Sequence, residues 1–569
     1  MKNKIICLLL ALMMVLSVFA LSACNQPEDP GNTPGGGGNG GDEPTPPGPT
    51  LKDNWWEDIT YKQTELRFKM TKNSNNTELS SGCERYLAGT TADDGDIDGM
   101  VDDRNEAALY NTNVTILYDY YDDTGDYTWS KCIDVIYKEI QSGSSSTPDM
   151  YCNFLTDMLS TSLLGSFANL YSRERGDNFI DRYADGYMGD LMSSLTLSTE
   201  KIYVIASDYY LDLIRSFYIV PVNRQMYDKI APTMPGLLDY NNDGVKNIDD
   251  FFEEVWAMKW TYDRVANYSA KVYNNTSGLA TPNLGDTVGF ALSSSSPLSA
   301  SGMVYTSSVT VIHKEWNKTT QDYDYYYPQD DSDIVALTNA LNNLFSQTGV
   351  ISVINSEGQK WGSDALQAIR YQFSQNKVLF GGVIMLGSLE YDDYQNMKGE
   401  NGGFGVVPAP LFRSTRIVTK DDGTTEEVQE NYQTQIHPVG RAGGIAHTTK
   451  KFTQCTAFVQ YQSTHSTEIL NEYYNYNLTY DIADGLQGNI EMLQFIRENV
   501  RSCFDKVFED SIGFFNVKGD SAAVANRWHN LISTNRYKMT NMDQEYARLY
   551  SLKEGYLKAL VKEYDDLPD

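Results

Sequence analysis

The sequence predicts an α/β protein with more than one lobe and a helical C-terminal third. Segments of strand and helix character alternate from Trp55 onward, which is the pattern of α/β architecture. The chain has 569 residues, more than one compact core usually holds. From Glu468 onward, the apolar residues recur mainly at helical spacing. These observations set the order of elements that we expect.

The first 23 residues predict a lipoprotein signal peptide. Lys2 and Lys4 precede an apolar run from Ile5 to about Leu21. The run ends in "LSAC", which resembles the lipobox of bacterial lipoproteins, where cleavage leaves a Cys that carries diacylglycerol. We therefore expect lipidation at Cys24 and a place on the extracellular face of the cell membrane. The alternative is an uncleaved anchor helix followed by a chance Cys.

Residues 24–54 predict a flexible tether after the lipidated Cys. Gly, Pro and acidic residues dominate this segment, and almost nothing apolar is present to bury. Of the seven Cys in the chain, the five beyond Cys24 are scattered without CxxC spacing. They indicate neither a disulfide framework nor a zinc site, and pairing of Cys132 with Cys152 stays open.

The first half of the folded body alternates strands and helices. The apolar run of Val114–Tyr121 predicts a strand, and Trp129–Gly143 has the spacing of a helix that stops at Gly. The segments that follow predict a buried strand, a helix and two further short strands: 148–154, 156–171, 201–210 and 215–228.

The second half is richer in helices. Strand character is clear at 402–410, and a DG turn between β-prone flanks predicts a hairpin at Arg416–Gln429. Helices are expected over the remaining apolar-periodic segments: 251–260, 261–273, 333–347, 468–478, 489–508 and 543–564.

Composition narrows the class of partner. The chain carries 45 Lys and Arg against 76 Asp and Glu, a formal charge of −31 that repels phosphate backbones and argues against nucleic-acid binding. It also carries 40 Tyr and 8 Trp. Tyr offers a flat apolar face beside a hydroxyl, which suits sugars, although abundant aromatics can equally be core.

The stretch "DYNNDGVKNIDD" has the ligand order of an EF-hand-type calcium loop. Oxygen side chains stand at loop positions 1, 3 and 5, a Gly at 6 and an Asp at 12. An Asx-rich turn without metal is the alternative. Because only one convincing loop is present, we expect a structural Ca²⁺ clip rather than a sensor. Its predicted ligands are Asp239, Asn241, Asp243, the carbonyl of Val245, Asn247 and Asp250.

Ordered short signatures resemble the extracellular solute-binding proteins of bacterial ABC importers, of the sugar-binding type called family 1. They run from about Asp103 to the C-terminus and follow a lipobox and a linker. Arg224 after Asn223, where Lys is usual, and the long insertion after Pro410 depart from the family pattern. The signatures are "DRNEAALYNTNVTILYDYY", "STPDMYCNF", "IYVIASDYY", "YIVPVNRQMYDK", "KWTYDRV", "LFGGVIML", "GGFGVVPAPLF" and "AGGIAHTTKK".

The resemblance implies a type II periplasmic-binding-protein-like fold with a hinge between two α/β lobes. It implies a monomer that captures a solute, most simply an oligosaccharide, in the interlobe cleft and delivers it to the permease subunits of an ABC importer. It assigns residues 55–220 and 408–449 to lobe one. Residues 221–407 and 450–569 go to lobe two.

Candidate ligand contacts are the aromatic and polar residues at expected strand ends and cleft loops. Such positions favour binding because loops and helix N-termini converge there. The candidates are Tyr120, Tyr121, Asp208, Tyr209, Tyr210, Ser299, Ser301, Tyr305, Trp361 and Arg441, with Trp256 and Trp260 as further stacking candidates for which helix packing is the alternative.

No catalytic set stands out, so we expect a binding protein rather than an enzyme. HExxH, GxSxG and P-loop patterns do not occur in the sequence. Carboxylates are abundant, so a surface glycoside hydrolase stays an alternative, as does a glycan-binding protein not coupled to a transporter. A dockerin-type docking module is a third reading, suggested by the calcium-type loop alone.

Overall fold

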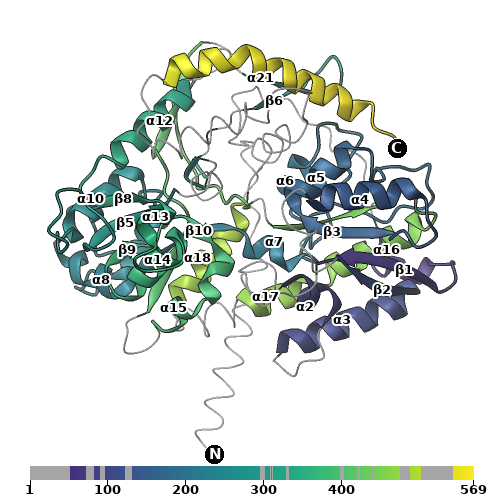
Figure 1. The fold of residues 1–569 in the computed structure, drawn as a ribbon, viewed down its shortest axis with the longest axis horizontal. Coiled ribbons are helices and arrows are strands. Elements are labelled where there is room, and N and C mark those ends of the chain that lie inside the picture. The colour runs from purple at the N-terminus through teal and green to yellow at the C-terminus, as the bar shows by residue number, and fades with distance from the viewer. Residues whose placement is uncertain are drawn as a thin grey trace, which may run out of the picture.

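The computed structural model describes residues 51–71, 82–89, 96–121, 131–294, 302–304, 306–307, 309, 312–327, 332–397, 403–419, 423–437, 440–474, 487–500 and 542–569. It contains two α/β bodies, each built on its own sheet (Figure 1). We call them the β1 lobe and the β5 lobe after a central strand of each sheet. The expectation of a two-lobed α/β fold is confirmed.

Within the described residues, the β1 lobe holds a four-stranded sheet of order β14-β3-β1-β2. Strand β1 pairs in parallel with β2 and β3, while β14 runs antiparallel to β3. Leu66, Phe68 and Met70 alternate along β1 and are fully buried, as period-2 spacing requires of a face that is covered by helices. The strands are β1 (Thr64–Met70), β2 (Val114–Tyr120), β3 (Met150–Phe154) and β14 (Arg441–Ile445).

Helices cover this sheet and supply the rest of the lobe. They are α2 (Gly82–Ala88), α3 (Asp96–Thr112), α4 (Lys131–Ser142), α5 (Leu155–Leu163), α6 (Gly189–Ser194), α7 (Leu211–Arg215), α16 (Phe452–Thr464) and α17 (Thr467–Glu472), with the 3₁₀ turn η1 (Trp55–Asp58) before β1.

The β5 lobe holds a six-stranded sheet in the described chain, of order β10-β4-β9-β5-β8 with β11 also paired to β4. Strand β5 is parallel to β8 and β9, whereas β4 is antiparallel to β9. The strands are β4 (Tyr218–Asn223), β5 (Val288–Ser293), β8 (Val350–Val353), β9 (Val378–Phe380), β10 (Ile384–Met385) and β11 (Phe404–Val407).

The β5 lobe is helix-rich and packs around Trp260, which is fully buried. The Trp260 indole Nε1 donates to the Pro408 carbonyl at 3.0 Å, and its ring meets those of Phe251 and Phe380. The helices are α8 (Arg224–Ile230), η2 (Ala231–Thr233), α9 (Ile248–Trp256), α10 (Tyr262–Val272), α12 (Ser332–Leu344), α13 (Asn355–Gly358), α14 (Ala365–Ser374), η3 (Leu386–Glu390), α15 (Asp392–Gln395) and α18 (Gln487–Glu498).

Two hairpins and one long helix complete the described structure. The predicted hairpin is confirmed as β12 (Thr415–Thr419) paired with β13 (Thr425–Gln429). A second hairpin joins β6 (His313–Asn317) to β7 (Asp322–Tyr326). Helix α21 (Met542–Asp565) passes over both lobes in Figure 1. No helix among the described residues is both long and apolar enough to cross a membrane.

Several expectations about the chain path differ from the structure. Residues 408–449 were expected in the first lobe, but Pro408 and Leu411 pack with the β5 lobe, where both are hydrogen-bonded to Trp260. We expected 450–569 to lie with the second lobe, but α16 packs against α3 and β1 of the β1 lobe. Its apolar residues, such as Phe458 and Val459, are needed to cover that sheet. We also expected a strand at 201–210, where the structure has two isolated bridges, Ile205 with Gly443 and Ser207 with Tyr187. Cys132, Cys152 and Cys455 are buried, and no disulfide joins Cys132 to Cys152.

Candidate functional site

The two sheets meet at the segments that carry the chain between the lobes. Phe217 bridges with Ile436, and the Leu155 amide, just past β3, donates to the Gly440 carbonyl at 2.7 Å. Because β4 is antiparallel to β9, its first residue Tyr218 lies at the carboxyl edge of the β5 sheet. The carboxyl edges of both sheets therefore converge on these crossing segments, where open α/β sheets bind ligands.

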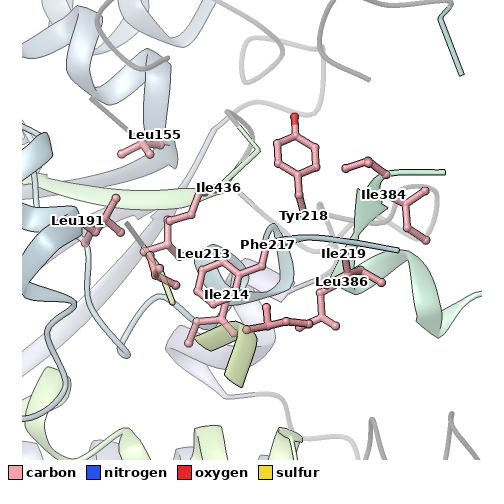
Figure 2. Packing of buried hydrophobic residues seen from close by; sticks show 14 of the residues in the cluster. Leu155, Leu191, Leu213, Ile214, Phe217, Tyr218, Ile219, Ile384, Leu386 and Ile436 are labelled. Carbon is pink, nitrogen blue, oxygen red and sulfur yellow. The ribbon is translucent and has the colours of Figure 1, made fainter. Parts of the chain in front are cut away.

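An apolar cluster forms the base of this crossing. Figure 2 shows Leu213, Phe217 and Ile436 packed together, with Ile219 and Leu386 beside them. All five are buried at 1% exposure or less. The cluster ties α7 of the β1 lobe to η3 of the β5 lobe, so it is a rigid pivot rather than a solvated linker.

Tyr218 and His437 are two polar side chains that meet at this crossing, and both are buried. The Tyr218 hydroxyl points away from the apolar cluster in Figure 2. Its ring meets the His437 imidazole edge to face at 5.6 Å between centroids. A Cβ placed on Gly302 would lie 3.1 Å from the Tyr218 ring, so the segment after β5 also reaches this point. An aromatic ring beside an imidazole suits a polar ligand that has an apolar face.

A buried ion network crosses from one lobe to the other next to the pivot. The Arg215 guanidinium donates to both oxygens of Glu390, at 2.9 and 2.6 Å, and to Asp212 Oδ1 at 2.6 Å. Tyr473 donates to Glu390 Oε1 at 2.5 Å. Asp212 and Glu390 together raise the pKa of Arg215 well above its usual value, although burial opposes this. The bidentate pair fixes α7 against η3 in one geometry.

Asp208 makes a second interlobe ion pair. Its Oδ2 accepts from Arg497 Nη2 of α18 at 3.0 Å and from the Thr467 hydroxyl at 3.4 Å. Burial raises the pKa of Asp208 to about 6, because desolvation, assisted by the Asp185 charge, outweighs Arg497 and Thr467. Asp208 was expected to contact a sugar; its carboxylate instead contacts Arg497 and Thr467.

The raised pKa predicts how stability depends on pH. Between pH 4 and pH 6 the folded chain holds a proton on Asp208 that the unfolded chain has lost, so this group's contribution to stability falls as pH rises. We expect the free energy of unfolding, relative to Asp208→Asn, to fall by about 2–3 kcal/mol from pH 4 to pH 7. Chemical denaturation of both proteins across this range measures it. A difference that does not vary with pH would contradict the prediction.

The aromatic residues expected at strand ends lie mostly inside the β1 lobe. Tyr209 is fully buried, with the Arg104 guanidinium 5.0 Å from its ring centroid. Tyr210 is also buried, beside Gly443 of β14. Tyr121 is buried at the end of β2, and burial raises its pKa well above the usual value. In the structure these rings pack the core instead of presenting a stacking face.

Tyr120, unlike these three tyrosines, is accessible. It lines a surface pocket of about 200 Å³ together with Lys69, Asp119 and Glu139. The Lys69 ammonium pairs with Glu139, and the Tyr151 hydroxyl donates to the same carboxylate at 3.2 Å. The pocket lies beside β1 and β2 of the β1 lobe, so Tyr120 stays a candidate ligand contact.

Arg441 is buried at the start of β14. Its Nη1 donates to Asn153 Oδ1 at 2.9 Å, its Nε lies 3.9 Å from Asp212 Oδ2, and its guanidinium covers the Phe154 ring at 4.3 Å. Asp212, in turn, pairs with Arg215. Arg441 therefore contributes a second positive charge beside Asp212 in the interlobe network.

The remaining candidates are dispersed. Trp361 is half-buried in the β5 lobe, with the Lys360 ammonium 4.8 Å from its ring centroid. The partly exposed Trp256 contacts Phe495 of α18, with the two rings tilted by 55°. Trp260 packs in the core, which was the alternative for this residue. Cys24, Ser299, Ser301 and Tyr305 lie outside the described residues.

The calcium-type loop folds into the start of α9. Asp250 accepts backbone amides from Tyr240 at 2.7 Å and from Asn247 at 3.0 Å, and the Asn247 side chain caps Asp249, which gives a capping box. Asp239, Asn241 and Asp243 likewise accept amides from within the loop. Among the described residues, no group of three or more His, Cys, Asp or Glu is placed to hold a metal ion.

The sequence reasoning missed four residues that build the crossing. They are Asp212 and Arg215, which stand three apart on α7, Glu390, and Tyr218. The signal for the first pair was an acidic and a basic residue within the apolar stretch "YYLDLIRSFY", where an unpaired charge would be costly. Glu390 had no local signal, because its partner lies 175 residues away.

Comparison with known proteins finds similarity at the level of structure. No family model matches the sequence, and no curated protein matches it. The GacH receptor of Streptomyces glaucescens, solved unliganded and with acarbose, is 13% identical with a TM-score of 0.45 over 87% of this chain and 98% of its own. A galacto-N-biose- and lacto-N-biose I-binding protein of an ABC transporter from Bifidobacterium longum is 11% identical, with a TM-score of 0.44 over 89% and 99%.

A third similar structure is the extracellular solute-binding protein family 1 member from Alicyclobacillus acidocaldarius. It is 9% identical, with a TM-score of 0.45 over 88% of this chain and 100% of its own. These neighbours are solute-binding proteins, and those with named ligands bind sugars. Since every one of these TM-scores is below 0.5, the likeness alone identifies neither the family nor the ligand of this chain.

Proposed function

We propose that this chain is an extracellular solute-binding protein that captures a solute between its lobes and delivers it to an ABC importer. The observation that carries the proposal is the convergence of both carboxyl sheet edges on one interlobe crossing, where Tyr218 and His437 lie buried against each other. That arrangement positions a ligand between two bodies that can move relative to each other. The ordered signatures in the sequence support the same class.

The solute we propose is an oligosaccharide. The crossing holds an aromatic ring beside an imidazole, both buried in this arrangement of the lobes, and the separate Tyr120 pocket of the β1 lobe is lined by hydroxyls and charged groups. Sugars present apolar ring faces and paired hydroxyls, which match such mixed surfaces. The ligand contacts that we propose are all non-covalent. Two carboxylates between the lobes, Glu390 and Asp208, are each paired with an arginine.

A ligand panel tests this function. The chain from Asn25 onward is screened against di- to hexasaccharides by thermal shift, and positive sugars are followed by calorimetry. We expect saturable stabilisation without any change in the sugar. Tyr218→Ala should weaken binding tenfold or more, while Tyr371→Ala on the outer α14 serves as the exposed aromatic control. Stabilisation by no saccharide would contradict the proposal, and release of shorter sugars would favour the hydrolase alternative.

We also propose that the mature chain is held at the membrane through a diacylglyceryl and acyl group on Cys24. The support is the lipobox-like ending of the apolar N-terminal run, followed by the tether of residues 25–54. Radiolabelled palmitate should enter the wild-type protein in a Gram-positive expression host and be lost from Cys24→Ser. Equal labelling of both proteins would contradict the anchor.

A structural Ca²⁺ in the loop 239–250 is a separate proposal. The loop supplies hard oxygen ligands, and oxygens that accept a backbone amide keep a second lone pair for a cation. Asp239, Asn241, Asp243 and the Val245 carbonyl would hold the ion, and Asn247 and Asp250 would complete the set or brace it from the helix end.

Calcium should therefore raise the melting temperature. We expect a saturable increase of roughly 2 °C or more over the chelator-treated protein, because the ion binds only the folded loop. Asp243→Ala should abolish the increase, whereas Asp263→Ala at the start of α10 should keep it. Equal melting with calcium and with chelator would overturn the proposal.

A further inference from the structure

Helix α21 joins the two lobes on the side away from the crossing segments. It spans Met542–Asp565, 24 residues, which corresponds to about 36 Å of helix. Figure 1 shows it passing from α12 of the β5 lobe to the region of α5 and α6 in the β1 lobe.

The C-terminal end of α21 is firmly docked on the β1 lobe. Tyr564 is fully buried, and its hydroxyl donates to Thr196 Oγ1 at 3.1 Å. The Lys201 ammonium donates to the carbonyls of Asp565 and Leu567 at 2.7 and 2.5 Å. Further donors to the residues after the helix are Tyr203 to the Pro568 carbonyl at 3.0 Å, Arg175 Nε to the Asp569 carbonyl at 2.9 Å and Asn169 to Asp569 Oδ1 at 3.0 Å.

The residues that hold the C-terminal end of α21 lie in segments that are themselves hydrogen-bonded to the β1 sheet. The Leu170 amide donates to Ile202, and Ala168 donates to Ile445 of β14, so the docking surface moves with that sheet. Leu557 and Leu560 of α21 are buried as well. An anchor of this kind combines apolar burial with several hydrogen bonds to backbone carbonyls, which together oppose fraying.

The preceding part of α21 contacts the β5 side. Glu554 Oε2 accepts the Tyr327 amide at 3.1 Å, just beyond β7, and the helix packs against β7 and α12. Helix α12 packs on α10, which covers β5. The β6–β7 hairpin itself reaches the β1 lobe, because Asp322 Oδ1 accepts the Thr199 amide at 3.3 Å.

We propose that α21 is a strap that limits how far the two lobes can separate. Two bodies joined only by crossing strands can open about a hinge. Here a second connection lies on the far side, so opening requires the strap to release one end. The strap keeps the lobes near the binding-competent arrangement and removes part of the free-energy cost of reaching it. This inference concerns the lobes themselves and holds for any solute.

Distance measurement between the lobes tests the strap without a ligand. Spin labels on a non-natural amino acid replace Tyr137 of α4 and Tyr371 of α14, both exposed. The strap is weakened at its anchor by Lys201→Ala combined with Arg175→Ala, which removes hydrogen bonds and leaves Tyr564 in place. A second variant, Tyr564→Ala, removes the buried ring.

The protein with an unaltered helix α21 should give one narrow distribution of the distance between the two spin labels. Both anchor variants should give a broader distribution with a longer mean distance at unchanged far-ultraviolet circular dichroism. Lys562→Ala, on the exposed face of the same helix, should match the wild type. Distributions that stay narrow and unshifted in folded anchor variants would overturn the strap. Failure of the sugar panel would leave this result unaffected, so the two proposals are tested separately.

Discussion

Arg215→Met is expected to destabilise the protein by about 3–5 kcal/mol. The change leaves Asp212 and Glu390 without the guanidinium that both contact, and Asp212 is almost fully buried. Removing one member of a buried ion pair is costly because the remaining charge keeps its desolvation penalty and loses its partner. Urea denaturation followed by fluorescence measures the loss.

The matched control is an ion pair in solvent. Lys138 pairs with Asp134 at 3.6 Å on α4, and both side chains are about three-quarters exposed. Lys138→Met should change stability by less than about 0.5 kcal/mol. A loss at Arg215 no greater than that at Lys138 would show that the interlobe network contributes no more than a surface pair.

Gly443→Ala is expected to cost about 3 kcal/mol or more. Gly443 lies in β14, where a Cβ would stand 1.8 Å from the Tyr210 hydroxyl oxygen and 2.5 Å from the carbon that bears it. Since Tyr210 is buried, its ring cannot swing into solvent. The added methyl group must therefore push β14 away from its partner or displace the ring.

A double-mutant cycle identifies the cause. Tyr210→Ala in the Gly443→Ala background should recover part of the lost stability, since the clashing ring is gone. Gly99→Ala is the control, because a Cβ added there would meet no atom within 4 Å and helix α3 gains from Ala. It should be neutral or stabilising by up to about 1 kcal/mol. If the stability losses caused by the two substitutions simply add, the added methyl group does not clash with the Tyr210 ring.

Local elements were predictable because their signals are local. The helix expected at Trp129–Gly143 is α4 over Lys131–Ser142, and the DG turn gave the β12–β13 hairpin. Helix α16 was assigned to the other lobe because amphipathic spacing states that a face is buried but not which sheet buries it.

The candidate site was less predictable for a related reason. Strand-end position raised Tyr209 and Tyr210 as ligand contacts, yet both rings pack the core, and aromatic residues serve either purpose equally well. Arg441 was correctly placed near the crossing, but Asn153 and Asp212, which hold it, lie hundreds of residues away in sequence. Pairings of this kind appear only once the chain is folded.

The pairing of β14 with β3 also fixes the order in which the protein can assemble. Gly443 lies opposite Cys152, so the edge of the β1 sheet is supplied by a strand that follows the whole span of β4 to β11. A chain that emerges amino end first exposes the open edge of β3 until that strand arrives. Long-range closure of this kind is slow and leaves an unpaired edge open to aggregation. Folding of this chain would therefore benefit from a factor that shields β3 while the β5 lobe forms.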